Sequence, residues 1–379
     1  MKKLYFVAGE MSGDAHGSAV MKAIWGEVGG EVAFRGVGGE KMASVDGAEG
    51  LRDWLDEAAV LGLWEVLKKY GYFRKEFARV LGEIDECAPD AVVLIDYPGF
   101  NLRLAKALQA RRPGTKIIYY ISPQVWAWNR GRIGKMARML DLMICIFPFE
   151  KELYESSGLR TEFVGHPMAD ALERGRFERE AELVGLFPGS RRREVDQHFG
   201  VMLEAAVRIK GQRPGVRFVA AAANDAMAEV MLRELGGSVL EDGACEIVTG
   251  RTHELMERVE CAAIASGTAT LEAAYFELPY CLVYRVAWPT WVAGKLLVKV
   301  DYLGIANLLA GREIVREFIQ REMTAENIAG ELLRLLGSDE AREGVCRELR
   351  AVTSKLGEKG SYGRAALEIV KAADEGGVK

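Results

Sequence analysis

The sequence predicts an α/β protein with two doubly wound parallel-sheet domains, and three observations support this fold class. Short apolar or β-branched runs alternate with helical periodicity along most of the chain, as in repeated βα units. Several of these runs are apolar without alternation, which is typical of parallel strands covered on both faces. The length of 379 residues fits two domains at roughly 100–200 residues each.

Two series of strands are expected, separated by a charged segment. Residues 168–182 lack an apolar stripe, so we expect a linker near residue 175, an N-terminal domain over 1–170 and a C-terminal domain over 175–350. Helical patterns near 324–336, 339–356 and 361–374 close the chain. The strands are expected near residues 3–8, 31–37, 91–96, 116–121, 141–147 and 160–164, and then near 182–187, 216–222, 244–248, 261–265 and 279–284.

Composition excludes several classes of protein. Apolar residues make up 49% and charged residues 28% of the chain, which is typical of a globular protein and not of a disordered one. The six cysteines are widely spaced and lie mostly in apolar runs, so we expect buried thiols and a reducing, cytosolic compartment. The longest uncharged run, 117–129, is shorter than the roughly 20 residues of a membrane-spanning helix, and we expect a protein that is neither exported nor membrane-spanning.

The first strand leads into a glycine-rich turn over residues 9–17. Its spacing matches neither a dinucleotide fingerprint nor a P-loop. The turn carries Glu10, Ser12, Asp14 and His16, next to backbone N–H groups that would be free to bind a ligand. The alternative is a tight turn with a capped helix and solvated charges.

Asp96 directly follows the wholly apolar run 91–95. Burial raises the pKa of a carboxyl group and brings it closer to neutral pH, where a general base operates. Asp96 is therefore the candidate general base, although an Asp at this position could instead cap the following helix.

Residues 97–140 contain no acidic residue and nine basic ones. An anionic membrane surface, a phosphorylated ligand and nucleic acid are all partners for such a segment. Nucleic acid is disfavoured because the chain has no recognised nucleic-acid module, and a solvated basic face without function is the remaining alternative. The basic residues are Arg103, Lys106, Arg111, Arg112, Lys116, Arg130, Arg132, Lys135 and Arg138.

Two strand-to-helix turns in the second half have the chemistry of phosphate binding. Gly189 would allow close backbone approach, and Arg191 could neutralise phosphate oxygens; an exposed charge run over 191–193 is the alternative. Ser266, Gly267 and Thr268 precede a helix whose N–H groups favour a pyrophosphate. Glu272 lies one turn further on and could accept both ribose hydroxyls, unless this is an ordinary capped helix.

Two apolar segments, 58–67 and 286–302, end in basic and aromatic residues. Either is a core segment or an interfacial, non-spanning membrane contact. For the first segment, Leu61, Leu63 and Leu67 are the candidate lipid-facing residues.

The turns resemble those of the lipid-A-disaccharide synthase family, inverting glycosyltransferases of the lipid A pathway. The resemblance runs in order over residues 4 to about 335. The matching motifs are Ala8-Gly9-Glu10 with Ser12-Gly13-Asp14, Ala59-Val60-Leu61-Gly62 with Glu65-Val66-Leu67, Ile95-Asp96-Tyr97-Pro98-Gly99-Phe100-Asn101, Ser122-Pro123-Gln124-Val125-Trp126-Ala127-Trp128, Gly165-His166-Pro167, Pro188-Gly189-Ser190-Arg191, Ser266-Gly267-Thr268 with Glu272, and Asn307-Leu308-Leu309-Ala310-Gly311-Arg312.

The resemblance implies a GT-B fold and transfer of 2,3-diacylglucosamine from its UDP donor to the 6-hydroxyl of 2,3-diacylglucosamine 1-phosphate. No metal or other cofactor is implied, and a DxD-type metal motif is absent from the sequence. The family likeness also implies peripheral association with the cytosolic face of the inner membrane, leaves homodimerisation open, and marks residues from about 355 to 379 as candidates to pack on the first domain. The implied roles are Asp96 as base, Glu10, Ser12, Asn101 and Trp126 on the acceptor side, and Arg191, Ser266, Gly267, Thr268, Glu272 and Asn307 on the UDP side.

Two other functions remain open at this point. A sugar-nucleotide 2-epimerase shares the two-domain scaffold but acts on one soluble substrate, so it has no use for acyl-facing patches. If the chain is a non-catalytic nucleotide-sugar or lipid-binding protein, the Asp96→Asn substitution would leave its behaviour unchanged. Assays for epimerised product and for the activity of that variant distinguish the three hypotheses.

Overall fold

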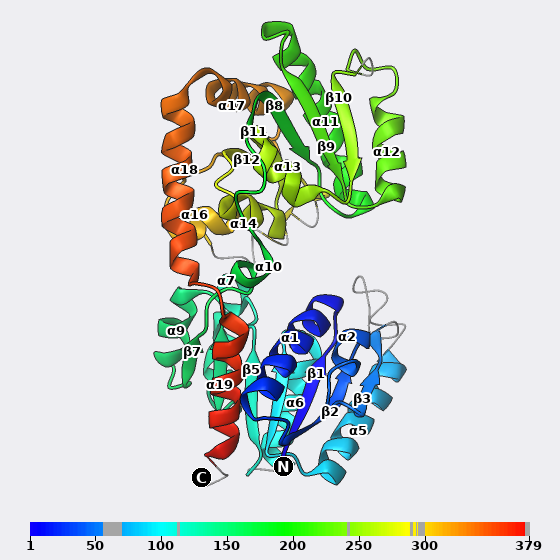
Figure 1. Ribbon diagram of the computed structural model, residues 1–379, viewed down its shortest axis with the longest axis vertical. Coiled ribbons are helices and arrows are strands. Elements are labelled where there is room, and N and C mark those ends of the chain that lie inside the picture. The colour runs from blue at the N-terminus through cyan, green and yellow to red at the C-terminus, as the bar shows by residue number, and fades with distance from the viewer. Residues whose placement is uncertain are drawn as a thin grey trace. The chain divides into compact units, whose positions relative to one another are not determined.

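The computed structural model describes residues 1–55, 70–111, 114–240, 243–288, 291–292, 294 and 300–375. The chain divides into two compact units. Unit 1 comprises Met1–Ala171 with Leu356–Lys379, and unit 2 comprises Leu172–Lys355. Each unit has helices packed around its own parallel sheet (Figure 1). Unit 1 is thus assembled from both ends of the chain.

The described sheet of unit 1 has seven parallel strands in the order β3-β2-β1-β4-β5-β6-β7. The chain adds strands outward from β1 in one direction and then returns to place β4 on the other side of β1. The strand order therefore reverses between β1 and β4, where an open α/β sheet forms its ligand crevice. The strands are β1 (Lys2–Ala8), β2 (Val32–Gly38), β3 (Gly50–Asp53), β4 (Ala91–Ile95), β5 (Lys116–Tyr120), β6 (Leu142–Cys145) and β7 (Thr161–Phe163).

Helices cover both faces of this sheet, and successive residues of β1 point to opposite faces. Leu4, Phe6 and Ala8 pack in the core under α1 and α19, whereas Tyr5 and Val7 pack in the core under α5 and α6. The C-terminal helix α19 lies beside α1, as Figure 1 shows. The helices are α1 (Met11–Glu27), α2 (Glu40–Ala43), α5 (Tyr70–Cys87), α6 (Pro98–Arg111), α7 (Val125–Trp128), η1 (Arg130–Arg132), α8 (Ile133–Met136), α9 (Pro148–Glu155), α10 (Met168–Ala171) and α19 (Ser361–Asp374).

The sheet of unit 2 has six parallel strands among the described residues, in the order β10-β9-β8-β11-β12-β13. Its strand order reverses between β8 and β11, which pair in parallel with Phe187 opposite Ile264. Unit 2 therefore has its own crevice-forming reversal. The strands are β8 (Glu180–Phe187), β9 (Arg217–Ala222), β10 (Cys245–Thr249), β11 (Val259–Ala265), β12 (Tyr280–Tyr284) and β13 (Glu317–Ile319).

Side-chain caps fix where several helices of unit 2 begin. Asn224, Thr324 and Ser338 each accept a hydrogen bond from the backbone N–H three residues further on, which satisfies an N–H that the helix leaves unpaired. The helices are α11 (Arg192–Gln212), α12 (Asp225–Leu235), α13 (Thr252–Arg258), α14 (Thr268–Tyr275), α16 (Ile305–Ala310), α17 (Ala325–Gly337), α18 (Asp339–Thr353) and η2 (Ser354–Leu356), the last of which crosses the boundary between the units.

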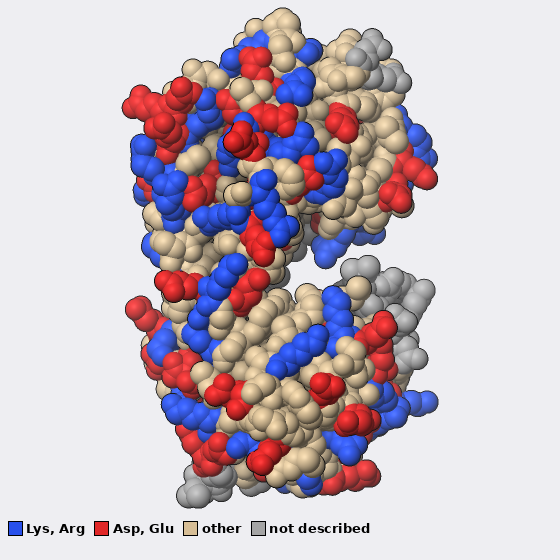
Figure 2. Space-filling model, in the orientation of Figure 1, with Lys and Arg blue, Asp and Glu red and all other residues tan. Residues whose placement is uncertain are grey.

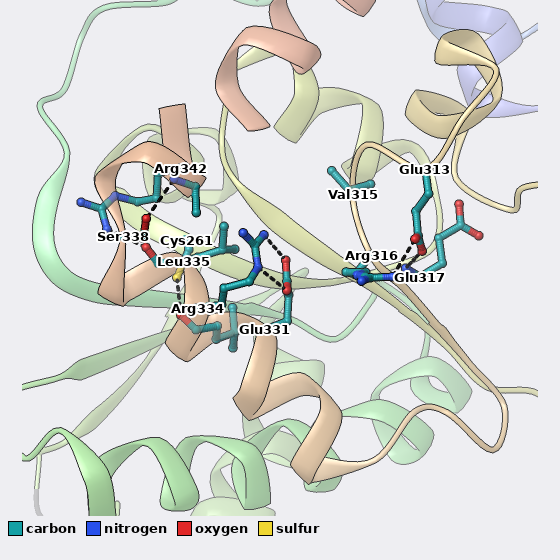
Figure 3. Close-up of polar contacts among 12 residues, drawn as sticks. Cys261, Glu313, Val315, Arg316, Glu317, Glu331, Arg334, Leu335, Ser338 and Arg342 are labelled. Carbon is teal, nitrogen blue, oxygen red and sulfur yellow. Dashed lines mark hydrogen bonds and ion pairs between the residues drawn. The ribbon is translucent and has the colours of Figure 1, made fainter. Parts of the chain in front are cut away.

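Polar contacts join the sheet of unit 2 to its C-terminal helices (Figure 3). The thiol of Cys261 on β11 lies 4.0 Å from the carbonyl oxygen of Leu332 on α17. Arg342 on α18 donates to the Leu335 carbonyl at 2.6 Å and pairs with Glu260 on β11 at 3.0 Å. All six cysteines are free thiols and four are buried, which confirms the expectation from their apolar surroundings.

Every strand that the sequence predicts is present, but β3 and β13 were not predicted. Both are edge strands of three or four residues, and none of their residues is fully buried. An edge strand of this kind carries polar residues such as Arg52 and Glu317, so it lacks the apolar run that marks a central strand. Among the described helices, none is long and apolar enough to cross a bilayer.

Asp14 stabilises the fold next to the first turn. Its buried carboxylate accepts hydrogen bonds from the backbone N–H groups of Gly39, Lys41 and Met42, at 2.8, 3.2 and 3.0 Å. The side chain therefore caps α2 from a different helix.

We predict that Asp14→Ala lowers the free energy of unfolding by about 2 kcal/mol, because three N–H groups lose their acceptor. Denaturant unfolding measures this change. The matched control is Asp46→Ala at an exposed position, which should change stability by less than about 0.5 kcal/mol. Equal effects in the two variants would contradict the capping role.

Candidate active site

The carboxyl ends of β1 and β4 in unit 1 bring together two turns that the sequence predicts to be functional. The turn starting at Gly9 follows β1, and the turn starting at Asp96 follows β4. These strands pair in parallel with Ala8 opposite Ile95, so both turns leave the sheet side by side. Glu10 precedes α1 with an extended backbone, and both Glu10 and Ser12 are exposed.

Gly9 is required at this meeting of the turns. A Cβ atom built on Gly9 would lie 2.2 Å from Cδ1 of the Tyr97 ring. Any other residue would push the ring, and with it the Asp96 turn, away from β1.

Hydrogen bonds fix the backbone around Asp96 in an unusual conformation. Asp96 and Tyr97 have φ angles of +42° and +48°, a region that costs a non-glycine residue of the order of 1 kcal/mol or more. The Asn101 amide donates to the carbonyl oxygens of Ile95 and Asp96 at 3.1 and 2.7 Å. The Tyr119 hydroxyl also donates to the Asp96 carbonyl, at 2.5 Å. The carbonyl groups on both sides of the first strained residue are therefore held.

The electrostatic surroundings of Asp96 favour a proton acceptor. Burial raises the pKa of Asp96 to about 6, the nearby Glu10 carboxylate adds to the rise, and the backbone N–H of Tyr97 opposes it. A carboxyl group with a pKa near 6 is ionised at neutral pH, yet it is a stronger base than a solvated Asp.

Asn101 lies beneath the turn and not on its surface. Its side chain is fully buried, and its amide protons are both used to hold the turn. Its Oδ1 is buried without a hydrogen-bond partner among the described residues. The geometry thus favours a role in positioning Asp96, while direct acceptor contact by Asn101 stays a prediction.

Trp126 is held by a carboxylate that the sequence analysis missed. Glu150 is almost fully buried and accepts hydrogen bonds from the Trp126 indole N–H at 2.9 Å, from the Ser122 hydroxyl and from the Phe147 N–H at 3.2 Å. Burial raises the pKa of Glu150 to about 7, although these hydrogen bonds oppose the rise. Pro148 and Glu150 occupy the first and third positions of α9, a capping pattern that could have identified this residue.

The carboxyl ends of β8 and β11 in unit 2 bring together the two turns that are predicted to bind phosphate. The turn of residues 188–191 follows β8, the turn of 266–268 follows β11, and these strands are neighbours. Gly189 has a φ angle of +115°, which glycine adopts without strain. The Glu194 carboxylate accepts hydrogen bonds from the N–H groups of Ser190 and Arg191 at 2.9 and 3.1 Å. These N–H groups thus already face an oxyanion, and the Arg191 side chain beside them is exposed.

Gly267 and Thr268 are exposed at the N-terminus of α14, beside the partly buried Ser266. Glu272, one turn further along α14, lies 3.4 Å from Nε2 of His253 at the start of α13. This hydrogen bond raises the pKa of His253 above its usual value. Glu272 and His253 thus place a carboxylate and an imidazole near the turn after β11.

Asn307 lies on α16, which packs against α14, and its side chain is fully buried. Its amide donates to the Val315 carbonyl and to Glu317, both at 2.8 Å. Its Oδ1 accepts from the N–H groups of Ile314 and Val315, at 2.7 and 3.0 Å. Contact with UDP would break these bonds, so the geometry favours a role in shaping the loop that follows α16, and UDP contact by Asn307 stays a prediction.

The basic segment of unit 1 is largely on the surface. Arg111 pairs with Asp85 at 3.6 Å, and over the face of both units shown in Figure 2 basic and acidic side chains are interspersed. The exposed members are Arg103, Lys106, Arg111, Arg130, Lys135 and Arg138. The candidate lipid-facing residues Leu61, Leu63 and Leu67 lie outside the described residues. Nowhere in the described parts of the chain do three His, Cys, Asp or Glu side chains gather as a metal site.

Solved structures resemble this chain in fold. A putative UDP-N-acetylglucosamine 2-epimerase from Listeria monocytogenes has a TM-score of 0.63 at 14% identity, over 99% of this chain and 96% of that one. The calicheamicin glycosyltransferase CalG4 has a TM-score of 0.59 at 14% identity, over 99% and 98%. Together with the two parallel sheets, these likenesses establish the GT-B fold of glycosyltransferases.

Comparison of sequences identifies the family of this chain more specifically than similarity of fold does. Residues 4–367 match the family model described as lipid-A-disaccharide synthetase. The lipid-A-disaccharide synthase of Geobacter metallireducens is 40% identical over 375 residues, 96% of each chain, and that of Persephonella marina is 38% identical over 389 residues, 98% of this chain and 99% of that one. The chain belongs to the lipid-A-disaccharide synthetase family, and is thus a hexosyltransferase of lipid A biosynthesis.

We predict that Glu150→Ala lowers the free energy of unfolding by about 3 kcal/mol, because it leaves the buried Trp126 N–H and its neighbours without an acceptor. Glu150→Gln, which keeps one carbonyl oxygen, should cost about 1 kcal/mol. Denaturant unfolding gives both values. Glu152→Ala, an exposed glutamate on the same helix, is the control; a loss at Glu150 as small as the control's would refute the network.

Proposed function

We propose that the protein transfers 2,3-diacylglucosamine from UDP-2,3-diacylglucosamine to the 6-hydroxyl of 2,3-diacylglucosamine 1-phosphate. The products are a β-1,6-linked disaccharide 1-phosphate and UDP. Family membership supports a glycosyltransferase of lipid A biosynthesis. The observation that carries the specific mechanism is the strained, partly buried turn that holds Asp96 at the reversal of strand order in unit 1.

Asp96 is the general base in this proposal. Its carboxylate removes the proton of the acceptor 6-hydroxyl while that oxygen bonds to C1 of the donor sugar, and the bond from C1 to the UDP oxygen breaks. Attack opposite the leaving group inverts the configuration at C1. Glu10 and Ser12, exposed beside Asp96, are the proposed acceptor contacts, with the Trp126 segment bordering them.

Unit 2 holds the donor in this proposal. The diphosphate binds at the turns after β8 and β11, and at the first of these it replaces the Glu194 carboxylate as acceptor for the N–H groups of Ser190 and Arg191. Arg191 and the N-terminus of α14 offset the charge that develops on UDP. Ser266, Gly267 and Thr268 form the second of these turns, and Glu272 accepts the ribose hydroxyls. Transfer requires that the acceptor oxygen at Asp96 and the donor C1 come within bonding distance.

Both sugars carry acyl chains, so the enzyme has to reach its substrates at a membrane surface. The exposed basic residues of 103–138 would favour an anionic leaflet, and Leu61, Leu63 and Leu67 are the proposed apolar contact. In this proposal the enzyme acts at the cytosolic face of the inner membrane.

The epimerase hypothesis has weaker support. Two 2-epimerase structures share the fold at 14% and 11% identity, whereas the relatives that match at 34–40% identity are lipid-A-disaccharide synthases. Formation of an epimerised UDP-sugar in the absence of acceptor would support the epimerase hypothesis.

We predict that Asp96→Asn lowers kcat by about 10²- to 10⁴-fold, because the amide cannot accept the proton. Binding of UDP, measured by titration calorimetry, should stay unchanged. Asp90→Asn is the matched control: Asp90 lies just before β4, at the opposite end of the strand from Asp96, and accepts the Lys3 N–H at 2.8 Å, a bond that the amide oxygen retains. Activity of the Asp96 variant at the level of the control would exclude Asp96 as the base.

We predict that Glu10→Gln moves the acidic limb of the kcat/KM profile to lower pH. The unmodified protein should lose activity below a pH of about 6, where Asp96 becomes protonated. Removing the neighbouring negative charge lowers the pKa of Asp96, although burial, the larger cause, remains. Glu27→Gln, at the exposed far end of α1, should leave the limb in place. A shift of the Glu10 variant to higher pH would contradict the electrostatic coupling.

A further inference from the structure

We propose that His198 is a positioning residue of the donor site, which sets the spacing between the turns that follow β8 and β12. The inference rests on the proposed function, because it assumes that the turn after β8 binds the diphosphate of the donor. His198 lies in the second turn of α11 and is not predicted as functional by any motif in the sequence.

Both ring nitrogens of His198 have backbone partners, and the side chain is 1% exposed. Nδ1 lies 2.9 Å from the carbonyl oxygen of Pro188, and Nε2 lies 3.1 Å from the backbone nitrogen of Arg285. A carbonyl only accepts and an N–H only donates, so the imidazole is neutral with its proton on Nδ1. Burial, the main cause, lowers the pKa of His198 and keeps this form at neutral pH.

The imidazole connects two turns that the sheet itself does not pair. In the strand order, β11 lies between β8 and β12, so the turns after β8 and β12 are two strand spacings apart, about 9–10 Å. Pro188 begins the turn of Gly189, Ser190 and Arg191. The turn of Ser266 to Thr268 follows the strand between them. His198 thus fixes the first phosphate turn across the end of the strand that carries the second.

The connection continues beyond Arg285. The Arg285 guanidinium donates to the carbonyl oxygens of Gln320, at 3.4 Å, and of Met323. The Gln320 side chain returns a hydrogen bond to the Val286 carbonyl at 3.1 Å. Gln320 itself follows β13. A series of hydrogen bonds starting at His198 therefore joins the turns at the carboxyl ends of β8, β12 and β13.

We call the two hydrogen bonds of the His198 imidazole, to Pro188 and to Arg285, the His198 bridge. Loss of this bridge is expected to weaken donor binding. The Pro188 carbonyl and the Arg285 N–H would lose their buried partners, and the turn would relax to satisfy them elsewhere. The phosphate N–H groups would then have to be reordered by the donor, which weakens donor binding. Chemistry at Asp96 belongs to unit 1, so kcat at saturating donor should change little.

Three substitutions of His198 test the bridge. His198→Gln offers an amide N–H and a carbonyl oxygen spaced like the two ring nitrogens, so UDP affinity should stay within about threefold of the unmodified protein. His198→Leu fills the space without hydrogen bonds and should raise the Kd of UDP, and the KM of the donor, about tenfold. His198→Asn keeps a donor near Pro188 but is too short to reach Arg285, so its Kd should lie between the two. Calorimetric titration with UDP measures each Kd.

The control is His16→Leu, the same substitution in unit 1, which should leave the Kd of UDP unchanged. An unchanged Kd in the Leu variant, or a Gln variant as weak as the Leu variant, would overturn the positioning role. If thermal melting shows the Leu variant unfolded, the comparison of Gln with Asn decides in the same way. Failure of the unmodified protein to bind UDP at all would instead contradict the proposed donor site.

Discussion

The reversal of strand order in each parallel sheet is the constraint on which the rest of the structure depends. At β1 and β4 in unit 1, and at β8 and β11 in unit 2, neighbouring strands send their chains to opposite faces. The turns that follow these strands therefore diverge, and polar residues stand at the point where they separate. Asp96 and Glu10 flank the first reversal, and Arg191 and Ser266 flank the second, so each unit presents one set of polar groups at one edge of its sheet.

In unit 1, burial and the like charge of Glu10 make Asp96 more basic, and a strained turn holds Asp96 in this position. The left-handed backbone at Asp96 and Tyr97 is unfavourable by itself, and the hydrogen bonds of Asn101 and Tyr119 to the Asp96 carbonyl hold it in place. The turn places the carboxylate where burial and the Glu10 charge both raise its pKa. Neither effect would survive if the turn relaxed, because the carboxylate would then be solvated.

The central strands and the turns after them could be predicted from sequence because their signal is local. A buried parallel strand is an apolar run, and a turn that binds anions carries glycine and small hydroxyl residues at its end. The resemblance to the lipid-A-disaccharide synthase family, which rests in part on motifs at these turns, was confirmed. The edge strands β3 and β13 lack an apolar run and were missed.

Contacts distant in sequence explain the remaining differences. Glu150 holds Trp126 from 24 residues away, and His198 reaches Arg285 across 87 residues; no spacing rule predicts such pairs. Ligand contact by Asn101 and Asn307 stays a prediction, and in the structure both side chains are buried and hold backbone groups of the protein. A polar residue in a functional motif can thus act by shaping a turn, and sequence alone does not separate this role from direct contact.

The most direct test of the proposed reaction is a stereochemical assay of the product. The protein is incubated with UDP-2,3-diacylglucosamine and 2,3-diacylglucosamine 1-phosphate, the product mass is determined, and the anomeric configuration is read from its NMR coupling constant. We expect UDP and disaccharide 1-phosphate in equal amounts, with a β linkage to O6. An α linkage, a linkage to another oxygen, or consumption of the donor without disaccharide formation would contradict it.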